Sequence, residues 1–164
     1  TECLQRYTRQ ELLDNEFRCP ACSAQGSCTK RLSLKKLPIV SCLHLKRFET
    51  HHLFGLSNKR RGPTKIDDFI QFPLELDLFP FTSSHIHDHK KNSPHNTIYE
   101  LFAVVEHFGS MNSGHYICHV KRENQWHLCD DENVHLSSEK KVEGCQAYIL
   151  FYIQKELLFG ERSK

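Results

Sequence analysis

The sequence lacks the features that would place it in a membrane or on nucleic acid. No stretch approaches the ~20 consecutive apolar residues that span a bilayer. Polar residues interrupt the first apolar stretch, so no signal peptide is recognisable. The net charge is only +2, from 22 Lys and Arg against 20 Asp and Glu. We therefore expect no membrane segment and no direct binding to nucleic acid.

A starting methionine is also lacking, since the chain begins at Thr1. A helix-like pattern follows at once, which suggests a piece of a longer protein. The 164 residues, of which 38% are hydrophobic, are enough for one globular domain with a core. No secretion signal accompanies the 8 cysteines, so we expect free thiols in a nuclear or cytosolic protein rather than disulfides.

The apolar pattern predicts an α+β fold, a mainly antiparallel β-sheet with few helices. An opening helix is predicted from Leu4, Leu12, Leu13 and Phe17. A short helix capped by Ser137 or Ser138 is predicted to reach Val142. Strands are predicted over 30–34, 39–45, 69–73, 99–107, 115–121, 126–130 and 147–152, with 39–45 as a central strand. Residues 1–155 are expected to form the domain, with exposed loops at 50–64 and 82–97, and 156–164 to form a tail.

The segment with catalytic potential is a predicted hairpin that turns at residues 123–125. Antiparallel pairing places His115 opposite positions 131–133, within one or two register steps of Asp130. A carboxylate at that range fixes the tautomer of an imidazole and stabilises the imidazolium. Such a histidine lowers the pKa of a neighbouring cysteine and activates its thiolate. From these residues alone, a structural hydrogen bond is the more common explanation of such a pair.

Three ordered blocks raise the catalytic explanation above the structural one. Residues 113–131 (SGHY…QWHLCDD), 35–48 (KKLP…LHLKRF) and 147–152 (AYILFY) resemble blocks of the ubiquitin-specific protease family. The resemblance extends from about residue 1 to about residue 153, and implies the C-terminal half of a ubiquitin-specific protease domain, a partial papain-like cysteine protease fold. Residues 19–48 and 66–73 resemble most closely the histone deubiquitinases of the SAGA coactivator.

The resemblance implies a role for each matching residue. His115 would be the general base that activates the nucleophilic cysteine, Asp130 would orient it, and Asp131 would support the site from behind. The residues that would border the channel for the ubiquitin tail are Ser113, Gly114, Tyr116 and Phe48. Gly114 also lets a substrate backbone approach closely, because it has no side chain. The loops 51–64 and 107–113 would gate the channel.

The nucleophilic cysteine of the family lies in an N-terminal block that nothing in this sequence resembles. Cys118 is three residues from His115 on the same strand and therefore faces the opposite side, and Cys129 points away from Asp130. Neither thiol is a suitable nucleophile. We therefore expect this chain to be inactive by itself.

A CxxC knuckle at Cys19 and Cys22 offers two ligands of a structural zinc site. Zinc needs four, and no second CxxC is present. In the family the partner pair lies upstream, so the resemblance implies half of a zinc site. Two unpaired cysteines in a turn are the other interpretation. The histidines of residues 85–95 are expected to lie in a solvated loop.

Three functions therefore remain open. The first is a thiol-dependent deubiquitinase that cleaves the isopeptide bond between ubiquitin and a lysine of a protein such as a histone, in the nucleus, with SAGA-type adaptor subunits as possible partners. The second is a catalytically dead domain that binds ubiquitin or scaffolds a complex, against which the intact His115, Asp130 and Asp131 argue. The third is a zinc-knuckle interaction domain without a link to ubiquitin. A cytoplasmic location is the alternative to the nucleus.

Overall fold

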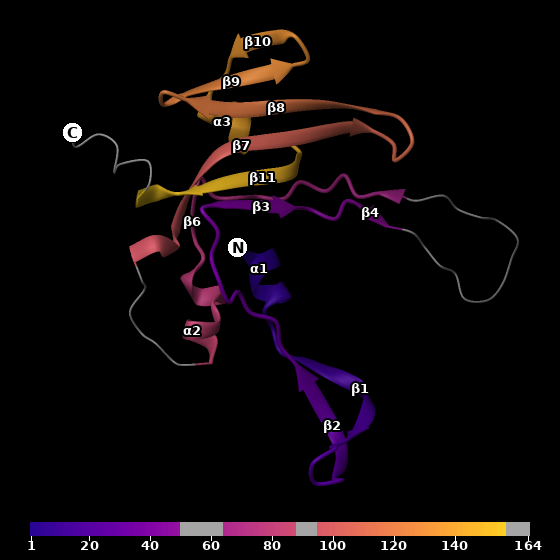
Figure 1. Ribbon diagram of the computed structural model, residues 1–164. Coiled ribbons are helices and arrows are strands. Elements are labelled where there is room, and N and C mark those ends of the chain that lie inside the picture. The colour runs from indigo at the N-terminus through magenta and orange to yellow at the C-terminus, as the bar shows by residue number, and fades with distance from the viewer. Residues whose placement is uncertain (50–63, 88–94, 157–164) are drawn as a thin grey trace, which may run out of the picture. The chain divides into compact units, whose positions relative to one another are not determined.

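The computed structural model describes residues 1–49, 64–87 and 95–156 (Figure 1). Its contacts divide the chain into two compact units. Unit 1 contains residues 1–37 and 77–98, and unit 2 contains residues 38–76 and 99–164. Most of the predicted loop 50–64 and nearly all of the predicted tail lie outside the described residues. Within the described ranges, no helix is long and apolar enough to cross a membrane.

Unit 2 is built on a sheet whose strands follow the order β10-β9-β8-β7-β11-β3, with β6 paired to β7 beside this path (Figure 1). Neighbouring strands along the path are antiparallel. The predicted α+β class with a mainly antiparallel sheet is confirmed. The strands are β3 (Val40–His44), β6 (Glu75–Asp77), β7 (Ile98–Gly109), β8 (Gly114–Arg122), β9 (Gln125–Asp130), β10 (Asn133–Leu136) and β11 (Ala147–Gln154).

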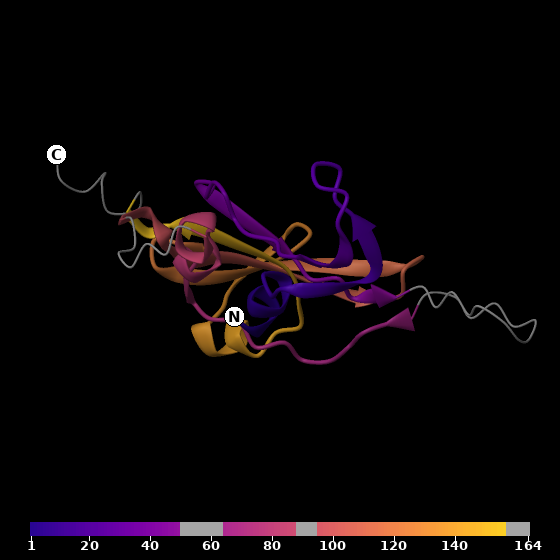
Figure 2. The same cartoon turned by 90° about the horizontal axis from the view of Figure 1, so that it is seen from below.

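The core of unit 2 lies along β7 and β11, whose alternating apolar residues are buried. Tyr99, Val104 and Tyr152 are fully buried. Helix α3 (Glu139–Glu143) lies against one face of the sheet (Figures 1 and 2) and buries Val142 completely. The Ser138 hydroxyl accepts a hydrogen bond from the Lys141 N–H, so the predicted cap and helix are confirmed.

A tight turn lies at each end of β9. Glu123 and Asn124 have φ values of 50° and 63°, which match the type I′ turn that suits a two-residue hairpin. This turn sets the β8–β9 register, in which Cys118 lies opposite Cys129. Asp131, with a φ of 49°, begins the second turn, which leads to β10. The position of β9 is therefore set by the turn to β8 before it and by the turn to β10 after it.

Short elements make up the rest of the described chain. In unit 1 these are α1 (Glu2–Tyr7), β1 (Glu11–Arg18), β2 (Gln25–Lys30), η1 (Phe79–Phe81), α2 (Ser83–Ile86) and η2 (His95–Thr97). Its buried apolar residues are Leu78, Phe79, Phe81 and Ile86. In unit 2, β4 (Phe48–Glu49) and β5 (Thr64–Lys65) form a separate two-stranded ribbon.

Several expectations from the sequence are wrong. The opening helix ends at Tyr7, and Leu12 and Phe17 lie on strand β1, where both are largely exposed. These apolar residues have helical spacing, but they are not buried against another element. The segment instead pairs with β2 in a hairpin. The strand predicted at 30–34 is also misplaced, because the observed strand is β2, Gln25–Lys30. Within 31–34, the described structure has only an isolated β-bridge, from Leu34 to Thr82.

Three further predictions, two of strands and one of a loop, differ from the structure. No strand covers 69–73, where Pro73 follows Phe72. The strand predicted to be central, β3, is an edge strand among the described residues. The predicted loop 82–97 contains the helical turn α2, because the Thr82 side chain caps it and Ile86 is buried. Residues 88–94 lie outside the described residues.

Candidate active site

The two groups at the centre of the candidate site meet across neighbouring strands. His115, the second residue of β8, and Asp130, the last residue of β9, are joined by a contact of 2.5 Å between Nε2 and Oδ1. The predicted meeting of the imidazole and the carboxylate is confirmed. Their side chains are 49% and 46% exposed, so the pair is accessible from solvent. With Nε2 bound by Asp130, the Nδ1 atom of the ring is available to a third group.

A second carboxylate joins this pair. The ligand atoms of His115, Asp130 and Asp131 all lie within 4.8 Å of one another. Asp131 occupies this position because the left-handed backbone of the turn after β9 brings its side chain back toward β8. The arrangement places two carboxylates beside one imidazole, where they can fix the orientation of its ring.

Gly114 precedes His115 and lies under the imidazole ring of His107. A Cβ atom at Gly114 would overlap His107 Nε2 and lie 2.6 Å from the carbonyl oxygen of Phe108. The glycine is therefore required by its neighbour within the sheet, a reason separate from the substrate approach predicted above. Gly109, at the other end of the loop, has a φ of 110°, which only glycine adopts readily. Ser113 closes this loop by accepting a hydrogen bond from the Ser110 N–H at 2.7 Å.

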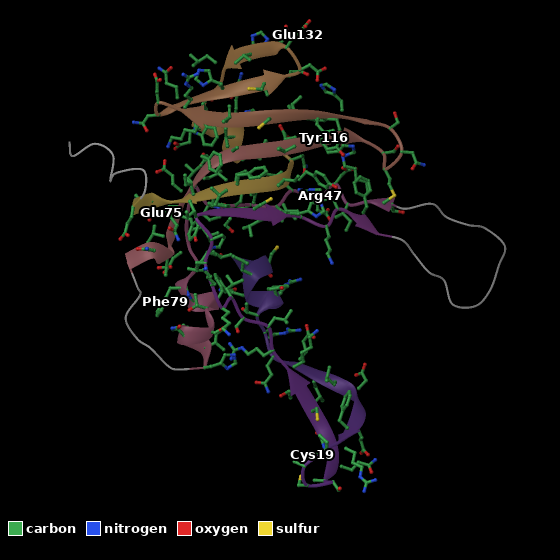
Figure 3. The ribbon with its side chains drawn as sticks, viewed as in Figure 1. Cys19, Arg47, Glu75, Phe79, Tyr116 and Glu132 are labelled. Carbon is green, nitrogen blue, oxygen red and sulfur yellow. The ribbon has the colours of Figure 1, made fainter. Side chains whose placement is uncertain are left out.

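An aromatic cluster lines the same end of the sheet. His107 lies 4.7 Å from Tyr116, 5.6 Å from Phe48 and 5.7 Å from Tyr148, measured between ring centroids. Tyr116 is 53% exposed, whereas His107 is only 5% exposed. Figure 3 labels Tyr116 and Arg47 near the same end of the sheet. The structure thus brings Phe48 and Tyr116, two predicted channel residues, to one cluster.

His107 and Tyr148 are members of this cluster that the sequence analysis missed. The Nδ1 atom of His107 is buried and has no hydrogen-bond partner among the described residues. His107 could have been found from the strand register, because it lies directly opposite Tyr116 across β7 and β8. Tyr148 gives no comparable signal, since it belongs to an apolar strand pattern.

A buried arginine holds the base of this cluster together. Arg47 is 2% exposed and donates hydrogen bonds to the carbonyl oxygens of Ala147, Ile66 and Asp68, at 2.7, 2.9 and 2.8 Å. These carbonyls belong to β11 and to the segment after β5. Arg47 therefore ties the residue before Phe48 to β11 and to the segment after β5.

The cysteines of unit 2 are not placed to react with His115. Cys118 and Cys129 lie opposite each other across β8 and β9, and burial raises the pKa of the Cys118 thiol, with a further contribution from Cys129. Burial, and then Glu106, raise the pKa of the Cys145 thiol to about 12. Cys42 is on β3, separated from β8 by β11 and β7, which corresponds to roughly 14 Å.

The predicted knuckle forms the tip of the β1–β2 hairpin, where Figure 3 labels Cys19. The Cys19 N–H donates to the Ala24 carbonyl and the Ser23 N–H donates to the Cys19 carbonyl, both at 2.8 Å. The backbone N–H groups of Cys22 and Ala21 lower the pKa of the Cys19 thiol. Hydrogen bonds that favour a thiolate favour metal binding. Cys19 and Cys22 thus lie together at the tip of this hairpin, where the thiolate of Cys19 is favoured.

Comparisons with known proteins agree with this geometry. A family model described as ubiquitin carboxyl-terminal hydrolase matches residues 7–152. Ubiquitin carboxyl-terminal hydrolase 51 of Mus musculus is 40% identical over 166 residues, which cover 96% of this chain and 24% of the relative. Ubiquitin carboxyl-terminal hydrolase 22 of Homo sapiens is 40% identical over 163 residues, covering 93% of this chain and 30% of the relative. The chain thus spans less than a third of these relatives.

Solved structures give the same result. A SAGA Ubp8/Sgf11/Sus1/Sgf73 DUB module bound to ubiquitin aldehyde matches with a TM-score of 0.78 and 37% identity, covering 94% of this chain and 33% of that chain. A second structure of the Ubp8-Sgf11-Sgf73-Sus1 SAGA DUB module matches with a TM-score of 0.71 and 36% identity, and covers 94% of this chain and 30% of that chain. The similarity therefore includes nearly all of the present chain.

Proposed function

Because this chain belongs to the ubiquitin carboxyl-terminal hydrolase family, we propose that it supplies the histidine and the carboxylates of a thiol-dependent deubiquitinase. The observation that carries the proposal is the contact of 2.5 Å between His115 Nε2 and Asp130 Oδ1, in a pair that is half exposed. A histidine whose only task is structural has no need of solvent access. The catalytic arrangement needs both features.

His115 exchanges protons in each half of the proposed reaction. Its Nδ1 accepts the proton of the nucleophilic thiol, and Asp130 stabilises the imidazolium that results. The thiolate attacks the carbonyl carbon of the terminal glycine of ubiquitin and forms a tetrahedral oxyanion. When the C–N bond to the lysine breaks, His115 returns the proton to the leaving amine. Water then hydrolyses the thioester with His115 again as the base, and the thiol is restored. Asp131 supports Asp130 in holding the ring.

The nucleophilic thiol is proposed to come from a segment outside the 164 residues. The thiols of Cys118 and Cys145 have raised pKa values, and Cys42 lies three strands away from β8. A reactive thiol needs a lowered pKa and a position beside the imidazole. The chain alone is therefore proposed to be inactive, and the relatives that it matches are about three times its length or longer.

The channel for the tail of ubiquitin is proposed to pass the exposed face of Tyr116 and the loop from Gly109 to Gly114. His107 and Tyr148 pack against Tyr116, and Phe48 packs against His107 in turn. The narrow strand edge at Ser113 and Gly114 suits a substrate segment of small residues. The loop 51–64 belongs to the same proposal, although it lies mostly outside the described residues.

The substrate and the partners are proposed from the solved relatives. These relatives are SAGA DUB modules that contain Sgf11, Sus1 and Sgf73. At 37% identity over nearly the whole chain, we propose an assembly of the same kind, with ubiquitinated histone as the substrate and the nucleus as the location. A structural zinc ion is proposed at Cys19 and Cys22, with its remaining ligands outside this sequence.

The experiment is to assay the protein in a form that contains the nucleophile, on a ubiquitin fusion, with and without His115→Ala. Loss of the general base should reduce turnover by about 10²–10⁴-fold. His135→Ala is the matched control, because His135 is exposed on neighbouring β10 and should leave turnover within about tenfold of wild type. Asp130→Ala should reduce turnover less than His115→Ala, because the imidazole remains. Activity of His115→Ala within about tenfold of wild type would contradict the proposal.

The same assay separates the enzyme from a catalytically dead ubiquitin-binding domain. A dead domain predicts that the wild-type protein binds ubiquitin without releasing it from the fusion. Both His115→Ala and Asp130→Ala would then leave the readout unchanged. The intact pair of His115 and Asp130 favours the enzyme.

A further inference from the structure

A second cluster of metal-ligating side chains is buried elsewhere in unit 2. Glu106 of β7, His119 of β8 and Cys145, which lies between α3 and β11, bring their ligand atoms within 4.8 Å of one another. The three residues are only 5–6% exposed. We propose that Glu106, His119 and Cys145 bind a divalent metal ion of the zinc type. This site is separate from the proposed catalytic pair and does not depend on the proposed function.

The sheet places the first two ligands side by side. His119 lies opposite Val104, and Glu106 follows Val104 by two residues, so Glu106 and His119 share one face of the sheet as diagonal neighbours. His119 Nε2 and Glu106 Oε1 are joined by a hydrogen bond of 3.2 Å in the absence of an ion. Zinc bonds of about 2.0–2.1 Å in a tetrahedron give an N···O edge of roughly 3.3 Å. The pair is therefore already spaced as two zinc ligands would be.

The third ligand completes a set that zinc prefers. A thiolate, an imidazole and a carboxylate all occur as zinc ligands in proteins, and the fourth position can be taken by water. In a tetrahedron, edges to sulfur are roughly 3.6 Å, which the 4.8 Å limit on these atoms accommodates with a small inward movement of Cys145. The cluster thus needs little rearrangement to enclose an ion.

Hydrogen bonds to the other polar atoms of Glu106 and His119 hold these two side chains in place. The Gln146 N–H donates to Glu106 Oε2 at 2.6 Å, and His119 Nδ1 lies 3.3 Å from Ser137 Oγ. Metal-binding histidines commonly donate their other ring N–H to a nearby acceptor, which fixes the tautomer. Here the Nε2–H of His119 donates to the Glu106 carboxylate. When a metal ion takes the place of that proton, Nδ1–H can donate to Ser137 and the Nε2 lone pair faces the ion.

Charge supports a cation at this point. The carboxylate of Glu106 and a thiolate at Cys145 carry two negative charges, which a divalent ion neutralises. Arg47 acts on Cys145 with one opposing positive charge, and its guanidinium already donates to three carbonyl oxygens. A metal ion binds a cysteine as the thiolate, in place of the thiol proton.

A metal here would join three segments that are far apart in the sequence. It would connect β7, β8 and the approach to β11 on the face that α3 covers. His119 is four residues from His115, which is about 13 Å along the strand. The ion would therefore stabilise the strand that carries the catalytic histidine without touching it.

The test is a titration of the purified, reduced and chelator-treated protein with Co²⁺. A cobalt–thiolate bond gives an intense charge-transfer absorption. Cys19→Ser and Cys22→Ser are introduced first, to remove the thiols of the knuckle. In this background we expect one equivalent of Co²⁺ to bind with thiolate absorption. Cys145→Ser should abolish the absorption, whereas Cys42→Ser, at an exposed cysteine of the same unit, should leave it unchanged.

Glu106→Gln provides a variant that keeps the fold. The glutamine carbonyl can still accept from Gln146 N–H, and its amide can still donate to His119, but the negative charge is lost. We expect at least a tenfold lower Co²⁺ affinity, and a Zn²⁺-induced rise in melting temperature that is present in the parent and reduced in this variant. Absence of thiolate absorption in the background protein would overturn the site. So would absorption that survives Cys145→Ser, or an unchanged affinity of Glu106→Gln.

Discussion

Replacing Gly114 with alanine should destabilise the hairpin of β7 and β8, because the space for a side chain is already occupied. The added Cβ would overlap the His107 ring and approach the Phe108 carbonyl oxygen to 2.6 Å. The ring is 5% exposed and packed against Tyr116 and Tyr148, so it cannot move freely. Inserting a methyl group into such a contact costs about 1–3 kcal/mol.

Trp126 is a suitable probe for this change. It is the single tryptophan of the chain, it is 4% exposed, and it lies on β9 opposite Lys121 of β8. Its fluorescence during urea unfolding therefore reports on the affected unit. A loss of about 2 kcal/mol divided by a slope of about 2 kcal/mol/M predicts a midpoint lower by about 1 M.

Gly144→Ala is the matched control, because its added Cβ would meet only Lys140 O at 3.5 Å and Lys141 O at 3.8 Å, which are ordinary contacts. Its stability should stay within about 0.5 kcal/mol of wild type. Adding His107→Ala to Gly114→Ala removes the overlapping ring, so the double variant should be more stable than the sum of the two losses by about 1 kcal/mol. Equal midpoints for Gly114→Ala and Gly144→Ala, or purely additive losses, would refute the steric argument.

Three further predictions concern the stability of unit 2, all measured by urea unfolding. Ser138→Ala should cost about 1 kcal/mol through loss of the cap on α3, and Ser138→Asp should not; equal losses would contradict the cap. Arg47→Lys should cost about 2 kcal/mol, because a single ammonium cannot match the guanidinium's three carbonyl partners, and a loss under about 0.5 kcal/mol would count against this role. Burial raises the pKa of Tyr152, so only the unfolded chain releases this proton near pH ~10, and stability should fall as the pH rises further. Tyr152→Phe should show a smaller alkaline fall, and an identical one would show that another group is responsible.

The sequence predicts the second half of this fold better than the first. Strands β7, β8, β9 and β11 alternate clearly, and the turn at Glu123 and Asn124 has a length that fixes the register. That register brings Asp130 within one or two steps of His115, close enough for the contact between their side chains. These features depend on residues close in sequence, so local pattern is sufficient to predict them.

The errors arise where distant contacts decide the structure. Leu12 and Phe17 have helical spacing, yet they pair with β2 in a hairpin whose apolar residues are exposed. The prediction of β3 as a central strand used its apolar composition, which does not reveal how many strands flank it. His107 packs closely on Gly114, and Glu106 lies near Cys145. No periodic pattern in the sequence relates these positions. Such side-chain packing has to be observed in three dimensions.

The type I′ turn between β8 and β9 has a consequence for how the family can vary in length. Side chains of a strand alternate between faces, so a slip of one residue in the pairing would turn Asp130 away from His115. We therefore expect that no functional relative inserts or deletes a single residue between these two positions. Longer insertions should be accepted only as loops that close at the same pair of flanking residues, Arg122 and Gln125.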